Sequence, residues 1–137
     1  MSARVLDASV AVRWFFPEEG REAALDLLRT SSFLYAPDLL VSEACNVAWK
    51  KVRLGQATPD QAIDVAKRLR TFFAELIPSQ ALAPRAVEIA LDLGHPVYDA
   101  FYVALAEQRS LTLITADRRL VSRVAGTRYA PYVHPLE

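Results

Sequence analysis

Short apolar stretches alternate with longer helical patterns along the whole 137-residue chain, and this alternation limits the folds that the chain can adopt. The apolar stretches predict strands at residues 4–7, 33–37, 74–78, 111–115 and 130–134. The stretches between them predict helices at residues 9–15, 21–30, 38–55, 58–70, 83–93, 97–108 and 118–124. Strands that are joined through helical crossovers pair in parallel. The sequence therefore predicts an α/β fold, a three-layer α/β/α sandwich, in a single domain over residues 1–137.

The composition is that of a globular chain, with 53% hydrophobic and 23% charged residues. No apolar run reaches the roughly 18–20 residues of a membrane span, and the N-terminus lacks the pattern of a signal peptide. The single cysteine, Cys45, has no partner for an internal disulfide, as is usual in a reducing compartment. The formal net charge is zero, so bulk charge gives no indication of nucleic-acid binding. We expect a cytoplasmic protein with no membrane partner.

Three aspartates occupy the ends of predicted elements. Asp7 ends the first strand, Asp99 lies at the start of an almost wholly apolar helix, and Asp117 directly follows the strand at 111–115. Each could be explained by a structural role alone, since aspartate caps helices and a negative charge in the first turn interacts favourably with the helix dipole. In a parallel sheet, however, ligand-binding groups gather at the carboxyl ends of the strands.

Glu43 is a fourth unusual acid, because it lies inside a helical pattern. It is spaced by four residues from Leu39 and from Val47, so we expect its carboxylate to project with the core-facing side chains. An unpaired buried carboxylate costs several kcal/mol. No basic residue lies one turn away from Glu43 to pair with it, and the first that follows is Lys50. Asn46 shares the face of Glu43 and could orient its carboxylate.

The predicted fold brings these four acids to one edge of the sheet. Carboxylates packed together repel, and some would protonate unless a cation lay among them. Oxygen ligands without cysteine or imidazole favour hard ions such as Mg²⁺ or Mn²⁺. His95 and His134 do not have the spacing of metal ligands.

The four acids lie in the motifs VLDASV, SEACN, PVYDAFYVALA and LITADRRL. Taken together, these motifs resemble the PIN domain family and, within it, the VapC-type toxin ribonucleases of bacterial toxin–antitoxin systems. The resemblance covers nearly the whole chain and is least diagnostic in the final segment, RYAPYVHPLE. It implies that the catalytic residues and the ligands of Mg²⁺ (or Mn²⁺) are Asp7, Glu43, Asp99 and Asp117. It assigns supporting polar positions next to these acids to Ser9, Asn46 and Thr115.

The same resemblance implies a five-stranded parallel sheet in the order 3-2-1-4-5. It implies a metal-dependent ribonuclease, the toxin component of a type II toxin–antitoxin pair, that cuts RNA with metal-activated water. The products would carry a 5′-phosphate and a 3′-hydroxyl. The expected assembly is a cytoplasmic homodimer, inhibited by a VapB-type antitoxin that binds near the site.

An aromatic cluster precedes the loop at residue 17 and offers a candidate surface for that antitoxin. It consists of Trp14, Phe15 and Phe16. One short helix seldom buries this much aromatic surface, although core packing would explain some of the three. We predict that the exposed members contact the antitoxin, because exposed aromatic patches mark interfaces.

Three other functions compete with this interpretation. A phosphoacceptor receiver domain is also a small parallel α/β fold with acids and Mg²⁺, but its chemistry needs a lysine after the last strand, and the last lysine here is Lys67. A catalytically silent PIN module that acts only as an interaction partner would not need the four acids. A metal-dependent nuclease acting on DNA stays open at the level of sequence.

Overall fold

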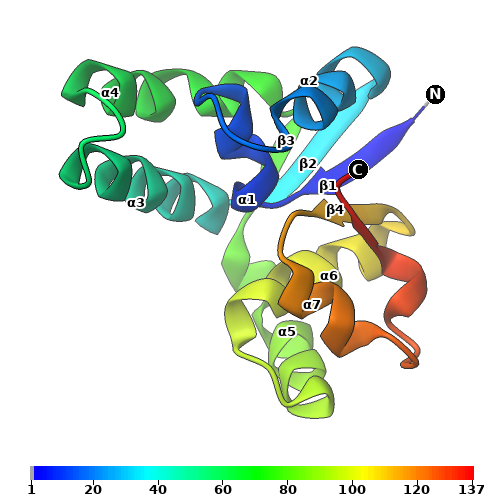
Figure 1. Ribbon diagram of the computed structural model, residues 1–137. Helices are drawn as coiled ribbons and strands as arrows, with labels where there is room; N and C mark the ends of the chain where they lie inside the picture. Colours follow the sequence, from blue (N-terminus) through cyan, green and yellow to red (C-terminus); the bar gives the residue numbers. More distant parts are fainter. Residues whose placement is uncertain (1) are drawn as a thin grey trace.

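The computed structural model describes residues 2–137 and shows a sheet of five parallel strands between two groups of helices (Figure 1). The strands are β1 (Ala3–Leu6), β2 (Phe33–Pro37), β3 (Glu75–Ile77), β4 (Thr112–Thr115) and β5 (Val133–Pro135). Their order is β3-β2-β1-β4-β5, and each neighbouring pair is parallel. The predicted α/β fold and the implied strand order 3-2-1-4-5 are therefore confirmed.

The helices lie in two groups on either side of the sheet (Figure 1). One group is α1 (Ala8–Ala11), α2 (Arg21–Thr30), α3 (Leu39–Arg53) and α4 (Pro59–Arg68). The other is α5 (Ser79–Leu93), α6 (Val97–Arg109) and α7 (Arg118–Val124). Three short 3₁₀ helices complete the chain: η1 (Val12–Trp14), η2 (Leu69–Phe72) and η3 (Ala130–Tyr132). No helix within residues 2–137 is long and apolar enough to cross a lipid bilayer.

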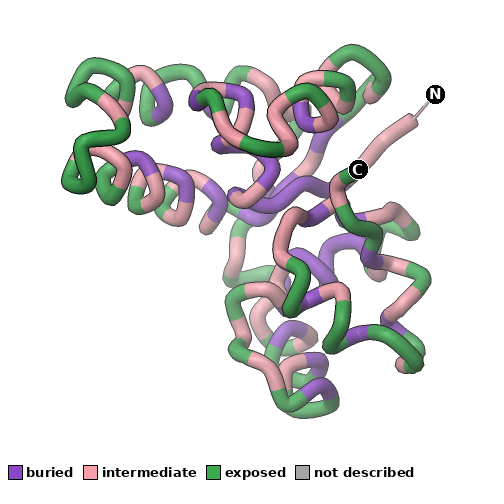
Figure 2. Tube along the Cα trace, in the orientation of Figure 1, coloured by how far each residue is buried: buried purple, intermediate pink, exposed green. Residues whose placement is uncertain are grey.

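The core is continuous across the sheet and is formed most densely by β1 and α6. Val5 and Leu6 of β1 are fully buried, and so is almost all of the segment from Tyr102 to Ala106 in α6. Buried segments run through the centre of both halves, whereas the outer faces of the helices are exposed (Figure 2). The central strand therefore holds the residue that follows it, Asp7, against the best-packed part of the molecule.

Helix α5 begins at Ser79, four residues before the predicted start at residue 83. Pro84, a residue type common in the first turn of a helix, lies inside α5. The helix start is held by Asp38, whose Oδ1 accepts hydrogen bonds from the Ser79 amide (2.9 Å) and hydroxyl (2.5 Å). Because Asp38 follows β2, this cap is a tertiary contact that local sequence patterns do not reveal.

The predicted helix at residues 9–15 is split into α1 and η1, and two of the three aromatic side chains at its end are buried. Trp14 is 6% exposed and Phe16 is 2% exposed. The Trp14 Nε1 donates a hydrogen bond to the Ala24 carbonyl oxygen (2.9 Å), and the indole packs against Phe72 and Phe73 with ring centroids 5.3 and 5.7 Å away. The prediction of an exposed aromatic cluster is therefore wrong for Trp14 and Phe16.

Phe15 differs from its two neighbours. It is half-buried, contacts Phe72 edge-on and lies beneath the guanidinium group of Arg68. Of the three aromatic residues predicted to contact an antitoxin, Phe15 alone keeps a partly accessible ring.

These burials predict a large difference between neighbouring aromatic positions. Trp14→Ala should lower the free energy of unfolding by about 3–5 kcal/mol, because it leaves a cavity and removes the donor to Ala24. Phe15→Ala should lower it by less than half as much, since its ring already meets solvent. Urea denaturation of both variants measures the difference, and equal losses would contradict the burial of Trp14.

Candidate metal-binding site

Asp7 follows β1 and caps α1 from a buried position. Its Oδ1 accepts hydrogen bonds from the Ser9 hydroxyl (2.5 Å) and the Val10 amide (3.3 Å), and its Oδ2 accepts one from the Thr115 hydroxyl. The residue is only 5% exposed. Burial raises the pKa of Asp7 to about 6, the charge of Asp99 adds to that rise, and the hydrogen bonds oppose it.

Ser9 and Thr115 join the two neighbouring strand ends around Asp7. The Ser9 hydroxyl accepts a hydrogen bond from the Ala116 amide (2.9 Å), and the Thr115 hydroxyl accepts one from the Asp117 amide (3.0 Å). The two hydroxyl oxygens are themselves 3.5 Å apart. The structure thus brings both hydroxyls against Asp7, whereas the resemblance associates Ser9 with Asp7 and Thr115 with Asp117.

Glu43 reaches the same region from α3. Its Oε1 accepts a hydrogen bond from the Tyr102 hydroxyl (2.6 Å). Burial raises the pKa of Glu43 to about 7, with smaller contributions from the charges of Asp7 and Asp99, and the tyrosine hydrogen bond opposes the rise. Burial and the neighbouring Glu43 raise the pKa of Tyr102 well above its usual value. Tyr102 was missed at the level of sequence, where its only signal is a hydroxyl within the apolar helix that follows Asp99.

The buried stripe of α3 is shifted by one residue from the predicted one. Glu43 is half-buried, as are its neighbours on the predicted stripe, Leu39 and Val47. The fully buried positions are instead Leu40, Ala44 and Ala48. Glu43 therefore lies at the boundary between the core and solvent, where a carboxylate can be partly desolvated and still reach a ligand.

Asn46 does not support Glu43 in the way that was predicted. It is exposed and lines a separate cavity of about 180 Å³ beside Lys50 and Leu54. Within residues 2–137, no hydrogen bond joins Asn46 to Glu43. The hydroxyl of Tyr102, which comes from α6, contacts Glu43 instead.

Asp99 lies in the first turn of α6, where His95 contacts it from the turn between α5 and α6. The His95 Nε2 is 2.7 Å from the Asp99 Oδ2, and both side chains are largely shielded from solvent. His95 was set aside at the level of sequence because it lacks metal-ligand spacing. The available signal was its short separation from Asp99, since His95 lies in the turn directly before the helix that carries this acid.

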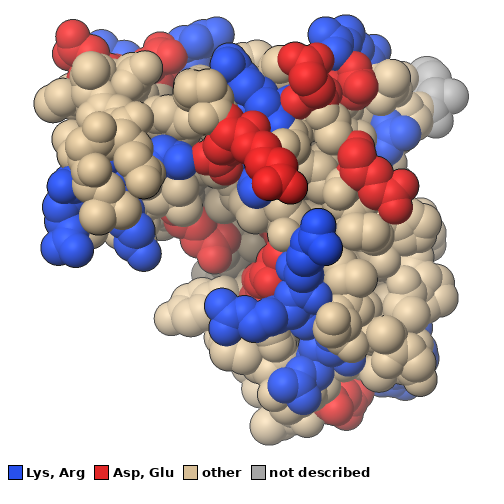
Figure 3. All heavy atoms as spheres, viewed as in Figure 1, with Lys and Arg blue, Asp and Glu red and all other residues tan. Residues whose placement is uncertain are grey.

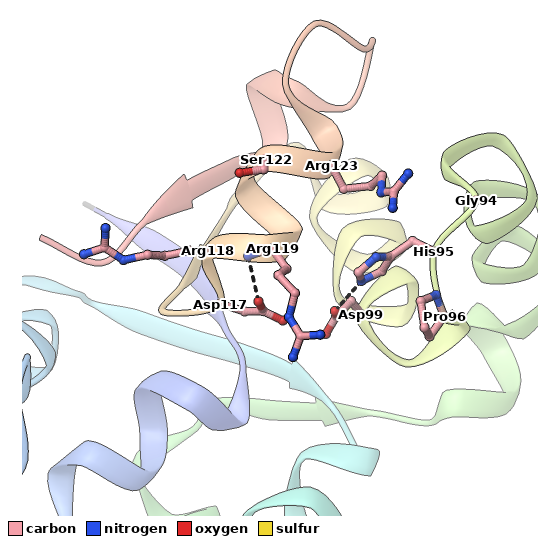
Figure 4. A pocket seen from close by; sticks show the side chains of 9 residues that line it. All are labelled: Gly94, His95, Pro96, Asp99, Asp117, Arg118, Arg119, Ser122 and Arg123. Carbon is pink, nitrogen blue, oxygen red and sulfur yellow. Dashed lines mark hydrogen bonds and ion pairs between the residues drawn. The ribbon is translucent and has the colours of Figure 1, made fainter.

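Asp117 caps a helix and also lies at the candidate site, the two roles considered for it from the sequence. Its Oδ1 caps α7 by accepting hydrogen bonds from the amides of Arg119 (2.9 Å) and Leu120 (3.4 Å). It also lines a cavity of about 840 Å³ together with Asp99 and His95 (Figure 4). Capping α7 therefore does not remove Asp117 from the candidate site.

Asp7, Glu43 and Asp99 form an electrostatically coupled group. The charge of Asp99 raises the pKa of Asp7, and both of these charges raise the pKa of Glu43. Within residues 2–137, no three Asp, Glu, His or Cys side chains are arranged closely enough to hold a metal ion as they stand. The donor set nevertheless fits a hard divalent cation in chemical type, because it offers carboxylate oxygens whose mutual repulsion a cation would relieve.

Comparison with known proteins gives one consistent result. Residues 4–126 match the PIN domain family. Ribonuclease VapC3 of Pyrobaculum aerophilum is 37% identical over 121 residues, which cover 87% of this chain and 92% of that protein. Ribonuclease VapC1 of Mycobacterium tuberculosis is 30% identical over 124 residues, which cover 89% of this chain and 91% of that protein.

Solved structures agree on the fold. A crystal structure of PAE2754 from Pyrobaculum aerophilum aligns with a TM-score of 0.70 and 25% identity, covering 92% of this chain and 82% of that one. A toxin–antitoxin complex from Klebsiella pneumoniae aligns with a TM-score of 0.64 and 19% identity, covering 96% and 95%. The chain therefore belongs to the PIN domain family, as its four motifs predicted, and is a VapC-type member of it.

Proposed function

We propose that the protein is a metal-dependent endoribonuclease and the toxin of a type II toxin–antitoxin pair. The observation that carries this proposal is the group of three carboxylates, Asp7, Glu43 and Asp99, which separate elements hold within electrostatic reach of one another. The relatives named as VapC ribonucleases support it, and so do neighbouring structures described as toxin–antitoxin complexes.

Mg²⁺ or Mn²⁺ would be held by Asp7, Glu43 and Asp99, with Asp117 at the adjoining cavity. When bound, the ion would lower the pKa of a water molecule and stabilise charge during in-line displacement at a phosphodiester. The remaining residues orient these ligands. Ser9 and Thr115 fix the carboxylate of Asp7.

Two further contacts restrict the other acids in the same way. Tyr102 donates to Glu43 from the core, and His95 holds Asp99 from the α5–α6 turn. Contacts of this kind, one layer outside the ligands, set ligand orientation and affinity in metal sites.

Attack by water, and not by a ribose 2′-hydroxyl, would leave a 5′-phosphate and a 3′-hydroxyl. The same mechanism does not require a ribose, so DNA stays the alternative substrate. A catalytically silent module is the other alternative, and it would show no cleavage with any metal. The homodimer, the cytoplasmic location and the VapB-type antitoxin belong to the same proposal.

Removing one proposed ligand should abolish cleavage. Asp7→Asn and Asp99→Asn each replace an anionic ligand with a neutral group of similar shape, so cleavage of RNA with Mg²⁺ or Mn²⁺ should disappear. Gel analysis of total RNA, with EDTA as a blank and mapping of the cut ends, measures the result. Asp64→Asn, on the exposed face of α4 where Asp64 pairs with Arg68, is the matched control and should cleave normally. Undiminished cleavage by either site variant would reject the assignment.

The raised pKa values predict that the metal-free protein loses stability as the pH rises. The pKa of Asp7 is raised from 3.8 to about 6 and that of Glu43 from 4.5 to about 7. Between these limits the folded state binds more protons than the unfolded state, so the unfolding free energy falls with increasing pH. Asp7→Asn removes the share of Asp7 in this pH-dependent loss, which is on the order of 3 kcal/mol of unfolding free energy.

Urea denaturation in EDTA at several pH values tests this point. The variant should gain stability relative to the wild type between about pH 4 and pH 6, and the difference should be constant at higher pH. Parallel pH profiles for the two proteins would show that Asp7 ionises normally in the folded state.

His95 should matter for metal binding through Asp99. His95→Ala should weaken the response to metal and slow cleavage about ten- to hundredfold, because the Asp99 carboxylate loses the group that orients it. His95→Gln, whose amide can replace the imidazole Nε2, should recover part of the loss. The rise in melting midpoint with added Mg²⁺ or Mn²⁺ reports binding separately from cleavage. Wild-type values for His95→Ala in both assays would exclude this role.

A further inference from the structure

Three arginines of α7 lie beside the acidic residues without acidic partners of their own. Arg118, Arg119 and Arg123 are exposed. Within residues 2–137, none of their guanidinium groups forms an ion pair or a side-chain hydrogen bond. Elsewhere, Arg29, Arg68, Arg85, Arg109 and Arg128 all contact carboxylates. Other basic side chains within residues 2–137 also lack an acidic partner, Arg53 and Arg70 among them, but α7 carries three such arginines within six residues beside the candidate site.

These arginines lie on both sides of Asp117. Arg119 and Arg123 line the cavity of about 840 Å³ that also contains Asp99 and Asp117, and Figure 4 shows Arg119 extending from α7 toward these two acids. Arg118 points the opposite way in the same view and also lines a second cavity of about 620 Å³, which contains Thr115. Positive groups thus flank the carboxyl end of β4 in two directions.

The space-filling view shows the same separation of charge on the molecular surface. Basic side chains gather over α7, next to acidic side chains in the hollow between the two halves of the molecule (Figure 3). A formal net charge of zero gives the protein no general attraction for a polyanion. An acidic site repels phosphate unless cations stand close to it, and guanidinium groups bind phosphate in a two-pronged geometry.

We infer that Arg118, Arg119 and Arg123 bind the phosphates of a single RNA strand on either side of the bond to be cut. This inference rests on the proposed nuclease function and assigns to α7 the binding of substrate. Contacts to phosphates position a strand without reading its sequence. The arginines should therefore set affinity and register, whereas the carboxylates carry out the chemistry.

Binding of a short single-stranded RNA, measured in EDTA by fluorescence anisotropy, tests the inference without cleavage. The logarithm of the binding constant should fall with the logarithm of salt concentration, and each lost phosphate contact should reduce the slope by about 0.7. The triple variant Arg118→Ala/Arg119→Ala/Arg123→Ala should therefore lose about 2 from the slope and bind about tenfold or more weakly. The loss should be equal for two oligonucleotides of unrelated sequence.

Arg70→Ala is the matched control. Arg70 is exposed in η2, which precedes β3. It therefore lies near the amino ends of the strands, whereas Asp7 and Asp117 follow carboxyl ends. Its removal should leave the slope unchanged. The variant Arg118→Lys/Arg119→Lys/Arg123→Lys keeps the three positive charges. It should therefore retain most of the salt dependence of the binding constant. Unchanged melting midpoints would show that all variants fold.

The possible results separate this inference from the proposed function. A wild-type protein that cleaves RNA, together with a triple alanine variant that binds with the same affinity and slope, would overturn the role of α7 and leave the nuclease proposal intact. A wild-type protein that neither binds nor cleaves RNA would remove both.

Discussion

The burial of Asp7 between the ends of β1 and β4 is the constraint on which the rest of the site depends. A carboxylate in this position is strongly desolvated, and the hydroxyls of Ser9 and Thr115 offset part of that penalty. The Ser9 hydroxyl also accepts a hydrogen bond from the Ala116 amide, so Ser9 connects the start of α1 to the segment after β4. The position of Asp117, one residue later, follows from this connection.

Around this centre, the molecule places negative and positive charges at different depths. Asp7 and Glu43 have raised pKa values because they are partly or fully removed from water, and each additional charge nearby increases the repulsion. Such an arrangement lowers the stability of the metal-free fold, and the proposed cation would relieve the repulsion. Arg119 and Arg123, in contrast, stay exposed at the adjoining cavity. A net charge of zero therefore conceals a strongly polarised surface.

Much of this arrangement could be predicted from local patterns. The alternation of strand and helix periods predicted a parallel sheet, because each strand needs a helical crossover to reach its neighbour. In such a sheet, an acid that directly follows a strand must lie at the carboxyl edge, which is why Asp7 and Asp117 were recognised as candidates. The helices at 21–30 and 118–124 and the strand at 33–37 have the predicted bounds, since their caps and apolar residues are local.

The rest depended on which faces of distant elements meet, and only the tertiary structure decides that. Tyr102 meets Glu43 across 59 residues of sequence, and Asp38 caps a helix that begins 41 residues later. Trp14 is buried because Phe72 and Phe73 cover it from beyond α4. The sequence by itself determined the order of the elements and the acids at their ends, because these follow from short-range periodicity and from chain direction. The tertiary structure decided burial, hydrogen-bond partners and pKa values, because these depend on side chains that are distant in sequence and meet only when the helices pack.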